Sequence, residues 1–181
     1  MGDAIVVTGY HGDSHGGLQL LLDPQLARTT PSAHQQALIT AHQRPQPRLD
    51  VLPLLEGLRA NSDRALVVAG MDSSDGLADA IVQICEASGV GAVVTRSTIP
   101  ISPALAQIFP ETALASALYG GEDFELVLCL PELVALELVK NIGSSGAIIG
   151  KIVRSPDIIF IDDLTNDPPI YLARHSGFQH F

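Results

Sequence analysis

Runs of aliphatic and β-branched residues, separated by glycines and polar segments, recur along the chain and predict buried β-strands. The six runs are residues 4–9 (AIVVTG), 65–70 (ALVVAG), 91–95 (GAVVT), 124–130 (FELVLCL), 147–153 (AIIGKIV) and 157–162 (DIIFID). The first run starts almost at residue 1. That position is typical either of an ordinary N-terminus or of the cut edge of something longer.

Apolar residues at helical spacing predict helices between these strands. In residues 74–88 the apolar face consists of Leu77, Ile81, Ile84 and Cys85. Further helices are expected in residues 10–22 after a Gly-rich turn, in 32–43 with Ser32 as N-cap, in 50–60 and in 132–142. Residues 99–121 are interrupted by prolines and are expected to be irregular.

Strands and helices mix without strict βαβ alternation, and the last two strands are joined across the short segment RSP, which favours an antiparallel hairpin. These patterns predict an α+β fold in which helices layer on both faces of a mixed sheet, an α/β/α arrangement. At 181 residues and 46% hydrophobic content, one domain spanning residues 1–181 is expected.

Charge excludes one class of function. Twenty acidic and ten basic side chains give a formal net charge of −10. Surfaces for nucleic acids or anionic membranes need clustered Lys and Arg, so neither partner is expected. Divalent cations are the more natural partners, although acidity also serves solubility alone.

Cysteine content and the absence of a targeting signal indicate the compartment. Cys85 and Cys129 are too few for a disulfide framework and wrongly spaced for zinc, so both are expected to be buried. No signal peptide precedes the first strand, and no apolar run approaches the ~18 residues that span a bilayer. A cytoplasmic protein is expected.

Residues 70–79, GMDSSDGLAD, form the first candidate site. Asp72, Ser74 and Asp75 lie between a strand end and a helix start, where free backbone N–H groups favour phosphate. Neighbouring carboxylates repel each other unless a cation lies between them, and Mg²⁺ shared with substrate phosphates suits such oxygen ligands. The alternative is that Ser73 or Ser74 merely caps the helix; spacing alone favours that alternative, but it leaves Asp72 unexplained.

The segment YGGEDFEL, residues 119–126, is the second candidate. Its glycines allow close approach of a ligand to the backbone, and Glu122 is able to accept hydrogen bonds from a cationic substrate. The alternative is a tight turn with solvated acids. Spacing alone does not rank Glu122 above Asp123.

Two further segments carry weaker signals. His11 and His15 lie among glycines, so a turn capped by Asp13 or Ser14 is favoured over a metal site. Residues 44–48 carry two arginines, as phosphate contacts or, more commonly, as solvated loop charges. Neither GxxxxGK[ST] nor GxGxxG is present.

Six segments in order carry a resemblance that extends over nearly the whole chain. They are VVTGYHGDSHGGLQLL, ALITAHQRPQPRL, GMDSSDGLAD, ASGVGAVV, LYGGEDFELVL and the terminal GFQHF. Together they resemble the C-terminal half of thiamine-monophosphate kinase, within the superfamily of aminoimidazole ribonucleotide synthetase. DSSDGL, GGEDFEL and GFQHF are more similar to the thiamine enzyme than to other members.

The resemblance implies roles for individual residues. Asp72 and Asp75 would be magnesium ligands and Ser74 an ATP contact, while Glu122 and Phe178 would lie at the thiamine phosphate. The implied reaction transfers the γ-phosphoryl group of ATP to thiamine monophosphate. Several Mg²⁺ ions suit phosphoryl transfer, and an aromatic ring suits the thiazolium cation.

One departure from the family concerns the N-terminal ATP-binding domain, which is expected to be absent from this chain. The isolated chain is therefore expected to be inactive, and its partners to be a separate N-terminal domain or further copies in a homo-oligomer. Two alternatives stay open: a non-catalytic thiamine phosphate-binding or regulatory module, and a related enzyme with another phosphate acceptor.

Overall fold

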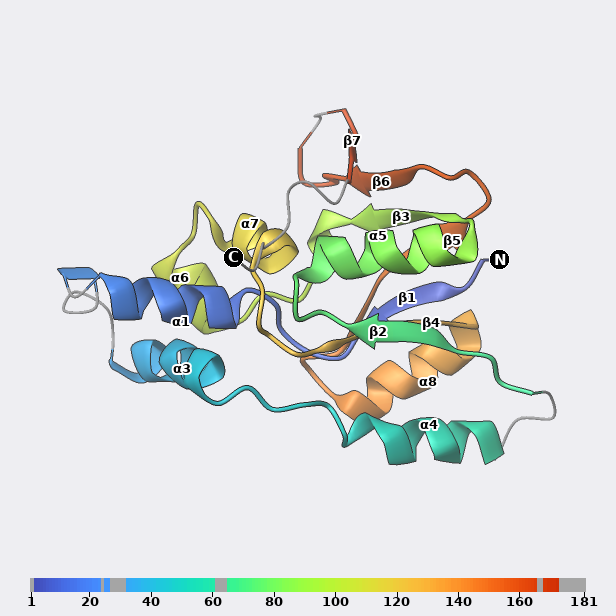
Figure 1. The fold of residues 1–181 in the computed structure, drawn as a ribbon, viewed down its shortest axis with the longest axis horizontal. Helices are drawn as coiled ribbons and strands as arrows, with labels where there is room; N and C mark the ends of the chain where they lie inside the picture. The colour runs from blue at the N-terminus through green and yellow to red at the C-terminus, as the bar shows by residue number, and fades with distance from the viewer. Residues whose placement is uncertain (1, 24, 27–31, 61–64, 166–167, 173–181) are drawn as a thin grey trace.

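The computed structural model describes residues 2–23, 25–26, 32–60, 65–165 and 168–172. Within them lies one mixed sheet with the strand order β2-β4-β1-β5-β3-β6-β7 (Figure 1). The strands are β1 (Ala4–Val7), β2 (Ala69–Asp72), β3 (Gly91–Thr95), β4 (Leu126–Leu130), β5 (Ala147–Val153), β6 (Ile158–Ile161) and β7 (Ile170–Tyr171). All neighbours pair antiparallel except β3 and β6, which are parallel.

The predicted hairpin between the last two long strands is wrong. Strand β3 lies between β5 and β6 and pairs with both. The connection passes over the start of β3 at Gly91, where an added Cβ would overlap the carbonyl oxygens of Ser155 and Asp157. The N–H group of Ala92 then donates to the carbonyl of Asp157 (3.1 Å). Because Gly91 has no side chain, the connection can cross β3 at close range.

Predicted strand positions are otherwise confirmed, with one shift. The run at 65–70 pairs only from Ala69, and β2 extends to Asp72 at the edge of the sheet. Antiparallel pairing with β4 sets these limits, since Ala69 lies opposite Cys129 and Asp72 opposite Leu126. The last residue of β2 therefore lies beside the first residue of β4.

Helices cover both faces of the sheet, as predicted. Helices α5 (Leu77–Ser88) and α7 (Ala113–Tyr119) pack on one face, and α4 (Val51–Ala60) and α8 (Glu132–Ile142) on the other (Figure 1). Alternate residues of β1 face the two layers, as expected for a strand buried on both sides. The layered α/β/α arrangement on a mixed sheet is confirmed.

The segment at 99–121 is not irregular as predicted. It contains α6 (Pro103–Ile108) and α7. Pro103 starts α6 because its missing N–H would have no helical partner there, and the Ser102 hydroxyl accepts from the Leu105 N–H (3.0 Å). The proline therefore marks a helix start.

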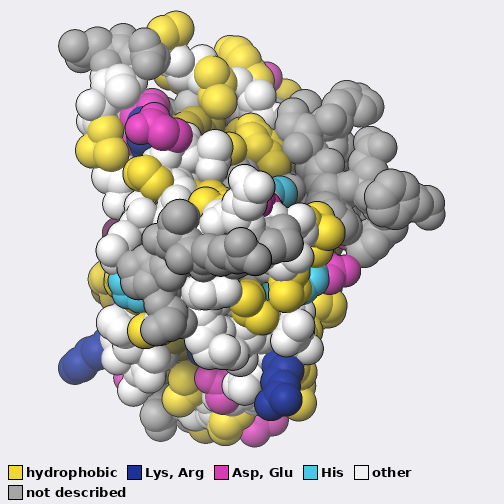
Figure 2. All heavy atoms as spheres, turned by 90° about the vertical axis from the view of Figure 1, so that its left-hand side faces the viewer, with side chains coloured by type: hydrophobic (Ala, Val, Ile, Leu, Met, Phe, Trp, Pro, Cys, Tyr) yellow, Lys and Arg dark blue, Asp and Glu magenta, His cyan; other side chains and the backbone are white. Residues whose placement is uncertain are grey.

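A third group of helices lies beyond the end of the sheet. It consists of α1 (Asp13–Leu22), α3 (Ser32–Gln43) and α6, which share a small apolar core that includes Leu20, Leu38 and Leu105. Viewed from this end, acidic, hydrophobic and histidine side chains are interspersed and basic side chains are sparse among the coloured residues (Figure 2). This face therefore offers no basic patch in the part that the structure describes.

Cys85 and Cys129 are buried and free, as predicted. Among the described residues, no helix has both the length and the apolar character needed to cross a bilayer.

Two helix glycines give opposite predictions for stability. At Gly17 an added Cβ would overlap the carbonyl of Leu38, so Gly17→Ala should force α1 and α3 apart and cost about 1–3 kcal/mol. At Gly57, in α4, nothing lies within 4 Å, so Gly57→Ala should add about 0.5–1 kcal/mol. Urea unfolding of both variants measures this, and equal effects would contradict the close approach of α1 and α3.

Candidate functional site

The first predicted loop joins β2 to α5 at the edge of the sheet. Asp72 is the exposed last residue of β2, and Ser74 and Asp75 are half-buried in the turn that follows. Gly76 is the N-cap of α5 with φ of 104°, a conformation that favours glycine. No side chain caps the helix. The alternative in which Ser73 or Ser74 caps it is therefore wrong.

The second predicted loop precedes β4 and meets the first. The Glu122 N–H donates to the carbonyl of Ser74 (2.6 Å), and the Ser73 N–H donates to the carbonyl of Glu125 (2.8 Å). Pairing of β2 with β4 explains this contact, because one loop follows the end of β2 and the other precedes the start of β4. Ser74 and Glu122 are thus brought together. Phe178 lies outside the described residues.

The second loop holds two residues in a costly conformation. Glu122 and Phe124 have φ of 69° and 55°, values that non-glycine residues rarely adopt. Such conformations cost on the order of 1 kcal/mol each and persist only where surrounding contacts fix them. The backbone around Glu122 is therefore held by its neighbours.

Asp123, between these two residues, caps α1. Its carboxylate accepts hydrogen bonds from the N–H groups of Gly12 (2.6 Å) and Ser14 (2.9 Å). Burial raises the pKa of Asp123 to about 7, although these two hydrogen bonds lower it. The predicted capping of α1 by Asp13 or Ser14 is wrong. Asp13 instead accepts from the Ser102 hydroxyl (2.6 Å), and burial raises its pKa.

His11 is fully buried and links three segments. Its Nδ1 lies 3.1 Å from the carbonyl of Gly9, and its Nε2 lies 3.0 Å from the Ser73 hydroxyl. A carbonyl only accepts, so the proton belongs on Nδ1, and Nε2 accepts from Ser73. Burial lowers the pKa of His11 to about 4, which keeps the ring neutral. No metal-binding cluster of three or more His, Cys, Asp or Glu residues occurs among the described residues.

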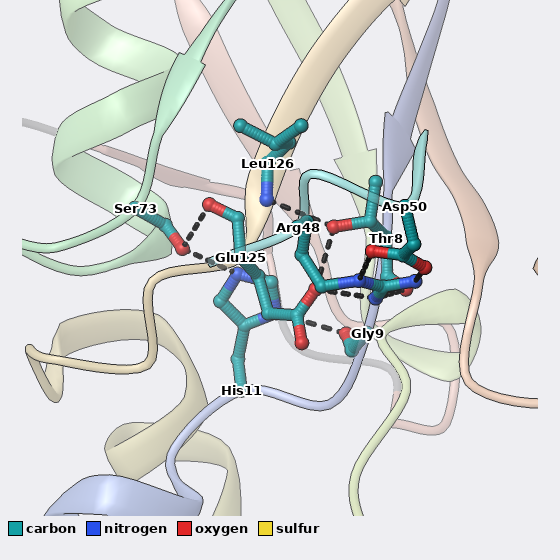
Figure 3. Close-up of polar contacts among 8 residues, drawn as sticks. All are labelled: Thr8, Gly9, His11, Arg48, Asp50, Ser73, Glu125 and Leu126. Carbon is teal, nitrogen blue, oxygen red and sulfur yellow. Dashed lines mark hydrogen bonds and ion pairs between the residues drawn. The ribbon is translucent and has the colours of Figure 1, made fainter. Parts of the chain in front are cut away.

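Glu125 is the centre of a buried polar network (Figure 3). Its carboxylate accepts from the Thr8 hydroxyl (2.5 Å) and from Arg48 Nη1 (2.7 Å). Arg48 also pairs with Asp50 (3.0 Å) and donates to the carbonyl of Thr8. The pairing with Asp50 contributes most to raising the Arg48 pKa. Arg48 is therefore not a solvated loop charge, and the other alternative that the sequence suggested, a phosphate contact, stays a prediction.

A cleft of about 640 Å³ lies beside this network. Its lining includes Tyr10, Asp13, Arg44, Arg48, Asp123 and Glu125. The lining does not include Asp72, Ser74, Asp75 or Glu122. The predicted site therefore lies outside this cleft, along the edge of the sheet.

The predicted magnesium ligands fit only part of a metal site. Carboxylates at positions 72 and 75 are hard oxygen donors of the kind that Mg²⁺ prefers. The described residues hold no third ligand near them, since no cluster of three such side chains occurs there. These two residues fit an Mg²⁺ ion whose other ligands are nucleotide phosphates, water or a second protein segment.

Reasoning from sequence missed the residues that fix the two loops. Asp123 and Glu125 bond to groups more than 50 residues distant, such as Gly12, Thr8 and Arg48, and no local pattern indicates such pairs. One usable signal was Gly9, directly after the first strand. A Cβ there would overlap the Glu125 carboxylate, so this glycine marks a close approach.

The neutral state of His11 predicts a specific pH dependence of stability. With a folded pKa of about 4 and an ordinary value of 6.5, its stabilisation is complete above pH 6.5 and is lost as the pH falls towards 4. The wild-type free energy of unfolding, relative to that of His11→Gln, should fall by about 3 kcal/mol over this range. Denaturant titrations of both proteins from pH 4 to 8 measure this difference. A difference that stays constant with pH would contradict a buried neutral ring.

Comparison with known proteins identifies close relatives. The family model described as AIR synthase related protein, C-terminal domain, matches residues 1–163. Thiamine-monophosphate kinase of Synechococcus elongatus is 45% identical over 185 residues, which cover 100% of this chain and 52% of that protein.

Solved structures agree with the sequence comparison. Thiamine-monophosphate kinase from Stenotrophomonas maltophilia K279a matches with a TM-score of 0.74 and 30% identity, over 91% of this chain and 52% of that one. A structure described as AaThiL complexed with AMPPCP and TMP matches with a TM-score of 0.67 and 25% identity, over 94% of this chain and 51% of that one. The chain spans about half the length of these relatives. It belongs to the AIR synthase related protein family and corresponds to the C-terminal domain of that family.

Proposed function

We propose that this chain is the C-terminal half of a thiamine-monophosphate kinase. Together with an N-terminal half, it catalyses attack of a phosphate oxygen of thiamine monophosphate on the γ-phosphorus of ATP. The bond between the γ-phosphorus and its bridging oxygen breaks, ADP leaves, and thiamine diphosphate forms. The relatives named above, which carry this enzyme name or bind AMPPCP and TMP, support the proposal.

The hydrogen bond between the Glu122 N–H and the Ser74 carbonyl is the observation that carries the proposal. It joins the loop that the family resemblance assigns to thiamine phosphate to the loop that it assigns to ATP and magnesium. Phosphoryl transfer needs an acceptor and a donor held in line, with little covalent chemistry by the protein. Direct contact between the two loops provides a fixed distance between the two substrates.

On the nucleotide side, Asp72 and Asp75 would hold Mg²⁺, and Ser74 would contact ATP. Mg²⁺ bound there neutralises phosphate charge as it develops during transfer. Asp72 ends the paired strand β2 and Asp75 lies in the short turn before α5, so the backbone positions of both residues are restricted.

On the acceptor side, Glu122 would accept hydrogen bonds from the polar edge of thiamine monophosphate, and Phe178 would stack on its cationic ring. The capping role of Asp123 supports the choice of Glu122, because Asp123 already accepts two backbone hydrogen bonds. The assignment of Phe178 rests on the GFQHF motif alone.

The proposed reaction also implies partners and a compartment. An N-terminal half, in the same polypeptide or in a separate chain, would supply the remaining ATP contacts and further metal ligands, and a homo-oligomer is compatible with this arrangement. Because the reaction consumes ATP, we place it in the cytoplasm.

Reconstitution tests the proposal. The 181-residue chain alone should form no thiamine diphosphate, because in this proposal the N-terminal half supplies most of the ATP contacts. Mixing it with the separately expressed N-terminal half of the Synechococcus elongatus enzyme should restore turnover, and Asp75→Asn should abolish that turnover. Turnover by the chain alone would contradict the half-site arrangement. Binding of thiamine monophosphate without turnover in any mixture would indicate a binding module, and turnover only with another phosphate acceptor would indicate a related enzyme.

Substitution of Glu122 should affect substrate binding, whereas substitution of Asp123 should affect stability. In the reconstituted enzyme, Glu122→Gln should raise the KM for thiamine monophosphate about tenfold and leave the melting temperature unchanged. Asp123→Asn should cost about 1–2 kcal/mol of stability, because one amide oxygen replaces two carboxylate oxygens at the start of α1. Steady-state kinetics and thermal unfolding of both variants measure these effects. The reverse pattern would assign the substrate contact to Asp123.

A further inference from the structure

The loop that carries Glu122 is strained, and its two sides are held differently. On the N-terminal side, the Glu122 N–H bonds to Ser74 and the Asp123 carboxylate bonds to the start of α1. On the C-terminal side, the loop ends at Glu125, directly after Phe124, whose φ is 55°. Contacts that fix Glu125 therefore also help to hold Glu122 and Phe124 at their positive φ values.

Glu125 is fixed through both its side chain and its backbone. Its carboxylate accepts from Thr8 and Arg48, and the Leu126 N–H donates to the same Thr8 hydroxyl (2.8 Å). Its carbonyl accepts from the Ser73 N–H (2.8 Å) and lies 3.1 Å from the Ser73 hydroxyl. One residue therefore holds the end of the strained loop and the beginning of the loop with Ser74 and Asp75.

Arg48 supplies the positive charge for this junction. Its side chain is 15% exposed and that of Glu125 is 16%, whereas Asp50, its second partner, is 63% exposed. An ion pair shielded from water is weakened little by solvent, but the exposed pair with Asp50 is weakened strongly. Loss of Arg48 would leave the Glu125 carboxylate, which is 16% exposed, without its counter-charge.

We propose that Arg48 is a positioning residue for the reaction: through Glu125 it holds the backbone that presents Glu122 and the segment Ser73–Asp75. This inference rests on the proposed function for the identity of the site. In this role Arg48 acts through the ion pair with Glu125 and through the backbone hydrogen bonds between the two loops.

Amide hydrogen exchange of the 181-residue chain tests the positioning directly. Arg48→Met should increase exchange at the Ser73 and Glu122 amides about tenfold more than at the β1 and β5 amides. Asp50→Asn, the matched control, removes only the exposed pair and should leave both amides as in the wild type. The double variant Arg48→Met/Glu125→Gln removes both charges, so it avoids an unpaired buried carboxylate if Arg48→Met alone does not fold, and it should show the same local increase.

Kinetics of the reconstituted enzyme provide the second measurement. Arg48→Met should lower kcat/KM for thiamine monophosphate about tenfold or more, Arg48→Lys should recover part of this loss, and Asp50→Asn should have no effect. Unchanged exchange at both amides, or an increase equal to that of β1 and β5, would overturn the inference by showing no local role. If the wild-type mixture shows no turnover, the proposed function fails, whereas the exchange result still decides whether Arg48 holds the two loops.

Discussion

Antiparallel pairing of β2 with β4 is the constraint on which the candidate site depends. It sets Asp72 opposite Leu126, so that the chain leaving β2 and the chain entering β4 run side by side at one edge of the sheet. Two segments about 50 residues apart in sequence then exchange main-chain hydrogen bonds. Strand pairing alone brings the loops near each other, but it does not determine their conformations.

Buried polar groups determine those conformations. Asp123, His11 and the pair of Arg48 with Glu125 each link a side chain of one loop to a distant segment. Burying such groups is costly unless each is fully hydrogen-bonded, and here each has identified partners. The ionisation states of the His11 ring and the Glu125 carboxylate suit this structural role. The imidazole stays neutral, whereas the carboxylate of Glu125 is matched by a guanidinium, so the network tolerates little change in charge.

The sequence predicted what depends on local pattern and missed what depends on distant partners. Periodicity located the long strands and helices, and the layered fold followed from them. The β5–β6 hairpin was wrong because Gly91 lets the connection pass over β3, and hydrophobic pattern does not encode that crossing. Helix caps were wrong for a related reason, since Asp123 replaces the local caps of α1 from more than 100 residues away. The family resemblance assigned ligand roles to residues of the two loops but did not predict their direct contact, and the role of Phe178 stays a prediction.

The acidic residues of the two loops divide into two groups by their roles. The carboxylates of Asp123 and Glu125 accept hydrogen bonds from distant segments, whereas Asp72, Asp75 and Glu122 are the residues assigned to Mg²⁺ and substrate under the proposed function. A carboxylate open to water binds Mg²⁺ weakly, because water screens its charge and competes for the ion. Electrostatic stabilisation of phosphoryl transfer requires a site from which water is excluded. Under the proposed function, the first group therefore fixes the two loops, and we expect a second protein surface to cover the second group before phosphoryl transfer takes place.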